Sequence, residues 1–493
     1  MPHKPTIATS EEDGAVIGEA MSRRSTRIGS QTKMEELQPV LMPRTAKKGT
    51  TDDASTEVTS ANTPMGNLKR RSLHDLPNEL LSRIFFYYTN ACDFEDGFQG
   101  PPTVSYQARA LLCSLDHQMR EAAIGSPQLW TSIQVRATPE ETIFPSQSLL
   151  KLWVKRSGSL LIHVDLYGPY DLTCGHPGDT GSPKRAIAAM QLLRSYIHRW
   201  KSFKIFFLDR SAEVFSDLPL QNAENLEEIE VVSSCPQELD DKLLANISKI
   251  PALRQVTWDK YILNGEDEIS SFQIAVLHFP WQQLRVITLS VMVSPDEAYQ
   301  LLSSATSAEV ILLKLRRNPS TPVDSTPRPL ATLPNLRFLE VRSDVGMYET
   351  LQHLDLPGLK ILYLCGRRYH CDGPNIACKR YKDFISRAAV SLQFAMIDTF
   401  DFRGDDVAEF FNNPELLNIP VLQVTLDDDE ARMKAEGALK LVFAATPNMP
   451  RRLRAQTTYW GSHLVGWVDG DVKEKYSTGF GYRRILAQLL ELD

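Results

Sequence analysis

The chain has 493 residues, of which 42% are hydrophobic and 23% are charged, and its formal net charge is −7. This length and composition suit two or three folded domains, and the negative charge favours neither nucleic acid nor an anionic membrane surface as a partner. No run of 18 apolar residues occurs that could span a bilayer, and the first residues lack the apolar stretch of a secretion signal. The seven cysteines, an odd number, fit a reducing compartment, so we expect a cytoplasmic or nuclear protein.

Residues 1–70 are rich in Ser, Thr, Pro, Lys and Glu and show no apolar period. A segment of this composition cannot bury enough apolar surface to offset the entropy lost on ordering, so we predict a disordered tail. Its short basic clusters, such as Lys69-Arg70-Arg71, are open to two interpretations, a nuclear-import signal or ordinary solvated charge.

A short apolar helix is predicted directly after this tail. Asp75 is a suitable N-cap, and Pro77 falls in the first turn, where a missing N–H costs nothing. Apolar residues then recur at helical spacing in a stripe formed by Leu76, Leu80, Leu81, Ile84, Phe85 and Tyr88. This stripe is wide for so short a helix.

A second helical pattern follows, with its apolar face formed by Ala108, Leu111, Leu112, Leu115, Met119 and Ala122. Gly125 and Pro127 end the pattern, and Leu129-Trp130 supplies a large apolar anchor directly afterwards. Two or three short helices are too few for a stable domain of their own. We therefore expect this helical module, residues 71–135, to pack against a partner or against the domain that follows.

Two motifs of this module carry a family resemblance. They are Leu76-Pro77-x-Glu79-Leu80-Leu81-x-x-Ile84-Phe85 and Ser126-Pro127-x-Leu129-Trp130. Residues 73–133 resemble the F-box, in particular the F-box of large fungal families that attach it to leucine-rich repeats. The second helix departs from the family pattern, because Asp116 stands where the family has Cys and Met119 where it has Trp.

Beyond the module, apolar residues alternate with a period of two, as in strands. Residues 160–166 and 203–208 are predicted strands, with a helical face from Ile187 to Trp200 between them. Six further copies start at Leu226, Leu253, Leu284, Val310, Leu336 and Leu359, at steps of 27, 31, 26, 26 and 23 residues. This is the period of leucine-rich repeats; unrelated α/β strands with crossover helices would not keep such spacing. Two blurred copies follow at 392–397 and 419–426.

We therefore predict an α/β protein in which a small all-helical F-box-like module precedes an irregular leucine-rich-repeat-like α/β solenoid. The solenoid is expected to occupy residues 136–455, and a C-terminal cap residues 456–493. Aromatic residues near the end of an open solenoid more often seal its core than bind a ligand. Intervening Arg, Glu, Lys and Gln side chains of the strands are expected on the face opposite the core.

The sequence contains no recognisable catalytic or cofactor motif. It has no phosphate-binding Gly loop with Lys-Ser or Lys-Thr, no His-Glu-x-x-His and no Gly-x-Ser-x-Gly. Cys365, His370, Cys371 and Cys378 gather within fourteen residues, but their spacing matches no zinc-binding pair. We predict no catalytic residue, no metal and no cofactor, and we interpret residues 366–379 as a loop insertion that serves recognition.

The F-box resemblance implies a non-catalytic adaptor. The module would bind the Skp-type adaptor of a cullin–RING ubiquitin ligase, and the repeats would recruit a protein substrate whose identity the sequence does not give. The resemblance assigns adaptor binding to Leu76, Pro77, Leu80, Leu81, Ile84, Phe85, Leu115, Met119, Leu129 and Trp130. Several of these residues would also form the module's own core. Two other classes stay open: a repeat scaffold whose degenerate F-box recruits no ligase, and an enzyme in a divergent α/β domain.

Overall fold

The computed structural model describes residues 73–91, 103–137, 143–167, 184–207, 217–233, 237–260, 279–315, 328–343, 350–366, 383–388, 390–398, 409–426, 429–445, 451–457 and 463–469. All of them belong to one unit of the chain, Arg71–Asp493. The predicted disordered tail, 1–70, lies outside the described residues. Among the described helices, none is both long enough and apolar enough to cross a membrane.

Short helices form the first described part of the chain. They are η1 (Leu73–Asp75), α1 (Asn78–Ala91), α2 (Thr103–Leu115), α3 (His117–Ile124) and η2 (Pro127–Trp130). The prediction of one continuous second helix is wrong, because Asp116 adopts an extended conformation with φ −153 and ψ 178. Its side chain accepts a hydrogen bond from the backbone N–H of Met119 at 2.9 Å and so caps α3.

A sheet of 14 strands follows. Its strands are β1 (Ser132–Ala137), β2 (Ile143–Phe144), β3 (Ile162–Tyr167), β4 (Trp200–Phe207), β5 (Glu228–Ser233), β6 (Gln255–Lys260), β7 (Val286–Val293), β8 (Val310–Leu315), β10 (Phe338–Ser343), β12 (Ile361–Gly366), β13 (Phe394–Asp398), β14 (Val421–Leu426), β15 (Arg451–Thr457) and β16 (His463–Asp469). From β1 to β14, apart from the antiparallel edge strand β2, neighbouring strands are parallel and follow one another in chain order. At the other edge β16 pairs antiparallel with both β14 and β15. The predicted α/β class is therefore confirmed, with a mostly parallel sheet.

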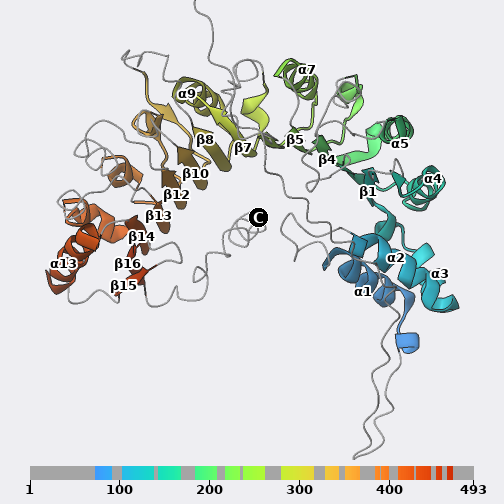
Figure 1. Cartoon of the computed structure of the whole chain (residues 1–493), viewed down its shortest axis with the longest axis horizontal. Coiled ribbons are helices and arrows are strands. Elements are labelled where there is room, and N and C mark those ends of the chain that lie inside the picture. The colour runs from blue at the N-terminus through green and yellow to red at the C-terminus, as the bar shows by residue number, and fades with distance from the viewer. Residues whose placement is uncertain are drawn as a thin grey trace, which may run out of the picture. The chain divides into compact units, whose positions relative to one another are not determined.

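Helices cover one face of this sheet. They are α4 (Gln147–Arg156), α5 (Lys184–Arg194), α7 (Gln237–Ile247), α9 (Pro295–Ser304) and α13 (Asp429–Ala445). In Figure 1, α4, α5, α7 and α9 lie along the same side of the row of strands. Their apolar side chains, such as Leu193 and Leu301, pack with alternate strand residues, such as Ile133, in one large buried cluster. Trp200, which the sequence analysis placed on a helical face, is instead the buried first residue of β4.

The turns that lead into the strands repeat one arrangement. From β5 to β13, the backbone N–H of the residue before each strand of the large sheet donates to the carbonyl of its counterpart one strand earlier, over 2.7–2.9 Å. Examples are Arg285 to Arg254, Arg337 to Glu309 and Lys360 to Arg337. In five of the six predicted copies the strand begins two residues after the first apolar residue, since that residue lies in the turn.

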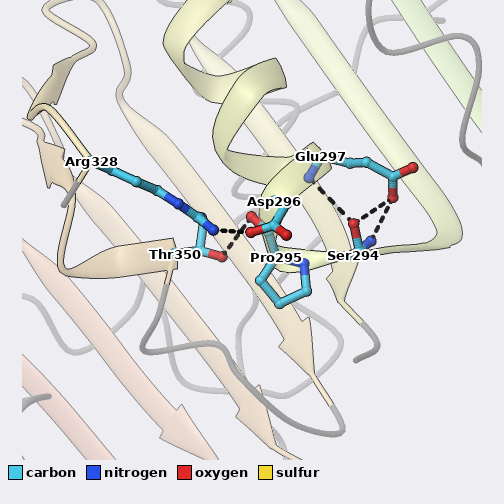
Figure 2. Close-up of polar contacts among 6 residues, drawn as sticks. All are labelled: Ser294, Pro295, Asp296, Glu297, Arg328 and Thr350. Atoms are coloured by element: carbon cyan, nitrogen blue, oxygen red, sulfur yellow. Dashed lines mark hydrogen bonds and ion pairs between the residues drawn. The ribbon is translucent and has the colours of Figure 1, made fainter. Parts of the chain in front are cut away.

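Polar contacts fix the start of α9 against later segments. Ser294 and Glu297 form a capping box, in which the Ser294 N–H donates to Glu297 Oε2 at 2.9 Å. Arg328 forms an ion pair with Asp296, and the Thr350 hydroxyl donates to the carbonyl of Pro295 at 3.4 Å (Figure 2). These contacts join one helix to two segments that lie more than 30 residues further along the chain.

Candidate functional site

Half of the residues assigned to adaptor binding form the core of the helical module. Leu81, Phe85, Met119, Leu129 and Trp130 are all buried in one small cluster, which is separate from the core of the sheet. Leu76 is half-buried and packs against the same cluster. The indole N–H of Trp130 donates to the carbonyl of Ala123 at 3.0 Å, so this large ring is held by packing and by a hydrogen bond.

The other assigned residues are exposed. Leu80 and Ile84 in α1 are both 44% exposed, Leu115 in α2 is 54% exposed, and Pro77 is also exposed. Further exposed apolar residues of the module, which the assignment omitted, are Leu73 in η1, Tyr87 and Tyr88 in α1, and Leu111 in α2. We refer to Leu80, Ile84 and Tyr88 as the exposed row of α1.

The wide apolar stripe of α1 therefore divides into two rows. Leu81 and Phe85 recur four residues apart and face the core, while the exposed row lies one residue earlier at the same spacing. Neighbouring residues of an α-helix are rotated by about 100°, so a stripe of this width cannot face one core alone. Fully burying each exposed Leu or Ile side chain in a partner interface would contribute about 1.5–3 kcal/mol.

The two departures from the family pattern serve the module itself. Asp116 is half-buried and caps α3, so a carboxylate at this position has a local structural role. Met119 is 4% exposed and lies in the module core beside the tryptophan of η2, where a flexible thioether side chain can fill an irregular space. The departures therefore leave the exposed row of α1 unchanged.

A tryptophan of the next segment completes the module core. Trp153 of α4 is buried there, with its ring 6.2 Å from that of Trp130. The Arg156 guanidinium lies 4.5 Å from the Trp130 ring, and the Arg109 guanidinium lies 5.1 Å from the Trp153 ring. Arg109 also donates to the carbonyl of Ser132 in β1 at 2.8 Å. Sequence reasoning missed Trp153, although a tryptophan on a short helix was a signal for it.

A cavity of about 310 Å³ lies where the module meets the first strands. Its lining residues are Phe86, Thr89, Arg109, Gln128, Leu129, Thr131, Ser132, His163, Asp165, Ser202, Lys204 and Glu228. Burial, and then the nearby Lys201 and Lys204, lower the pKa of His163, so its imidazole is neutral at pH 7. Its Nδ1 lies 2.7 Å from the Ser202 hydroxyl, which resembles a base beside a nucleophile. Ser202 is only 2% exposed, and we interpret the pair as a structural hydrogen bond.

The sheet face opposite the described helices has two parts. Strand residues that share one register position are polar from β1 to β6, namely Ser132, His163, Ser202, Glu228 and Gln255. At the same position from β7 to β14 they are Val286, Val310, Phe338, Ile361, Phe394 and Val421. We call these six residues the apolar row. At this register position the prediction that charged and amide side chains occupy the face therefore holds for the first part only, although Glu340 of β10 lies on the same face two residues further along.

No group of His, Cys, Asp and Glu that could hold a metal ion occurs among the described residues. Of the cysteine-rich cluster noted in the sequence, only Cys365 lies within the described part of the chain. Burial, and then Asp398, raise the pKa of its thiol to about 11, so it is protonated at neutral pH. His370, Cys371 and Cys378 lie outside the described residues.

The chain matches no protein-family model and no curated protein. Its function is therefore inferred from its residues and their geometry. In the described part of the chain these offer contact surfaces, in particular the exposed row of α1 and the polar part of the sheet face opposite the described helices.

Proposed function

We propose that this protein is the substrate-recognition adaptor of a Skp–cullin–F-box ubiquitin ligase. Its helical module would bind the Skp-type adaptor, and its repeats would recruit a protein substrate. The observation that carries the proposal is the exposed row of α1, which leaves Leu80 and Ile84 in solvent within the F-box-like motif. Exposed apolar side chains at helical spacing are typical of a helix that packs against a partner.

The sheet supports the second half of the proposal. Strands that follow one another in chain order, each entered by the same hydrogen-bonded turn, are what a leucine-rich-repeat-like solenoid would form. The antiparallel pair β15–β16 lies at the last edge and would act as its cap. Such a solenoid presents its helix-free face to a protein ligand over many strands.

On this proposal the protein performs no bond chemistry. It would hold lysines of a substrate near a ubiquitin-loaded enzyme that its partners supply, and so raise their effective concentration. Leu81, Phe85, Met119, Leu129 and Trp130 would act indirectly, since they build the core that positions the exposed row. Pro77, Leu80, Ile84 and Leu115 would make direct contacts.

Co-purification tests the proposal. Tagged full-length protein should capture the Skp-type adaptor, and a double variant, Leu80→Asp with Ile84→Asp, should lose it. Val390→Asp is the matched control, because Val390 is 90% exposed in the repeat part and receives the same change. Absence of the Skp-type adaptor from the wild-type sample, or its unchanged capture by the double variant, would show that the ligase assignment is wrong.

The second candidate is a repeat scaffold whose degenerate F-box recruits no ligase. Asp116 and Met119 favour it, because both replace family residues of the second helix. The same experiment separates the candidates. A scaffold would capture proteins through its repeats with no Skp-type adaptor among them.

A further inference from the structure

The apolar row is buried although it lies on the sheet face opposite the described helices. Its exposed fractions are Val286 7%, Val310 2%, Phe338 1%, Ile361 4%, Phe394 8% and Val421 0%. The six residues form a cluster of their own, and the partly buried apolar residues packed against it, Leu312 and Met396, come from the same sheet. No described helix packs on this cluster, so another segment of the chain must cover it.

The position of the apolar row on the sheet limits which segment of the chain can cover it. Each member is the first residue of its strand, and the segment that leads directly into each strand is described. The undescribed segments that follow these strands leave from the opposite edge, about 17 Å away along a strand of six residues. The five residues 446–450 lead into β15 at the same edge as the row. Their two ends are fixed by α13 and β15, so this short segment cannot extend across the row.

The C-terminal segment, residues 470–493, follows β16 at the edge of the sheet where the apolar row lies. Because β16 runs antiparallel to β14, Val468 pairs with Val421, and the chain leaves β16 at Asp469 beside the last member of the row. The row crosses six strands, or about 24 Å. The 24 residues of the segment can span this distance easily, since an extended chain covers about 3.3 Å per residue.

A buried carboxylate adds a hydrogen-bond requirement to this surface. Glu340 lies on the same face of β10, between Leu312 and Tyr363 of the neighbouring strands, and is 1% exposed. Its Oε1 accepts a hydrogen bond from Arg342 Nε at 2.5 Å. Its Oε2 is buried and accepts no hydrogen bond from the described residues. Arg342 already pairs the charge of Glu340, but the second carboxylate oxygen still needs a donor, and the covering segment should supply one.

The sequence of residues 470–493 has both required properties. Its apolar residues at helical spacing are Ile485, Leu486, Leu489 and Leu490, and its cations are Lys473, Lys475, Arg483 and Arg484. We propose that residues 470–493 bind in cis across the apolar row, with their leucines on the row and an arginine on Glu340. If the proposed function holds, on which this consequence rests, a substrate that uses β7 to β14 must first displace the segment.

Photo-crosslinking in the full-length chain tests the proposal. With p-benzoylphenylalanine in place of Phe394, irradiation should yield an intramolecular link to a peptide from residues 470–493. The same replacement at Gln255, at the same register position in the polar part, should yield none to that segment. Links from position 394 to residues 1–70 instead, or to no peptide outside the sheet, would overturn the proposal.

Three full-length variants test the contacts with the same readout. Leu486→Asp with Leu489→Asp should reduce the link from position 394 at least about tenfold, because two buried leucines become charged.

Glu340→Gln should reduce the yield of the same link about tenfold, which is the loss expected for one charged hydrogen bond. Glu230→Gln is the matched control, because Glu230 holds the same register position in β5 and pairs with Lys204 at 3.0 Å. Equal yields for Glu340→Gln and Glu230→Gln, with circular dichroism unchanged, would contradict the role of Glu340. This readout involves no Skp-type adaptor, so it can fail or succeed independently of the proposed function.

Discussion

The helical module and the sheet bury their apolar side chains in different ways. In the sheet, one buried cluster runs from Ile133 to Leu439, and each strand is flanked by similar neighbours. The core of the module has nine buried residues, one of which, Trp153, belongs to α4. The module also leaves Leu80 and Ile84 exposed. The sheet thus has a continuous core of its own, whereas the module completes its core with a residue of α4 and leaves apolar side chains exposed on its other side.

The largest expected effect on stability comes from removing Trp153, the residue of α4 that completes the module core. Trp153→Ala should lower the free energy of unfolding by about 3–5 kcal/mol, because it empties a packed aromatic site. The loss should be concentrated in α1 to α3, and hydrogen exchange measured by mass spectrometry would show faster exchange there than in β5 to β14. Trp153→Phe keeps part of the ring packing and should cost less. An equal increase in hydrogen-exchange rate in the module and in the sheet would show that the two regions do not unfold separately.

A glycine in the sheet tests how tightly its repeated turns stack. A Cβ at Gly358 would lie 2.7 Å from the carbonyl oxygen of Pro334 in the preceding turn. Gly358→Ala should therefore lower the free energy of unfolding by about 1–3 kcal/mol, through overpacking against backbone. Gly437→Ala is the control, since nothing lies within 4 Å of that Cβ, and alanine in a helix should stabilise by about 0.5–1 kcal/mol. Urea unfolding of both variants measures the contrast, and a neutral Gly358→Ala would show that the turns are loosely stacked.

The smallest expected effect lies at the junction of the two regions. The pKa of His163 is lowered in the folded state, chiefly by burial, so the unfolded chain binds a proton there more readily. Stability should therefore be full above pH 6.5 and decrease as the pH falls below it. Urea unfolding at pH 7.5 and 5.5 should show a smaller decrease for His163→Gln than for wild type. His198→Gln, at an exposed histidine, should retain the wild-type decrease; equal slopes for all three proteins would refute this assignment.

The alternation of apolar residues was sufficient to predict the strands from β5 to β14, because each strand needs one buried face. It misplaced their starts, since Leu226 and Leu336 have the spacing of strand residues but lie in turns. Trp200 was assigned to a helix because its spacing from Ile197 fits a helical period as well as the start of a strand. Short apolar runs cannot separate these cases by period alone.

The candidate site was predictable only in part. Helical spacing identified the apolar residues of α1, but it could not tell which of two adjacent rows faces the core, because that depends on tertiary packing. The contribution of Trp153 and the apolar row both depend on contacts between segments far apart in sequence. Pairs such as Phe338-Leu339 and Ile361-Leu362 were a signal for the row, since a half-exposed strand would alternate from its first residue.

Two adjacent leucines of α1 provide the most direct test of the central claim, that the module folds through one row and docks through the other. Calorimetry should measure the Kd of full-length protein for a purified Skp-type adaptor, beside the free energy of unfolding. Leu80→Ala should weaken binding by about tenfold or more while changing unfolding by less than about 0.5 kcal/mol. Leu81→Ala should lower the free energy of unfolding by about 2–5 kcal/mol. Wild-type affinity in Leu80→Ala, or no binding by the wild-type protein, would contradict the account.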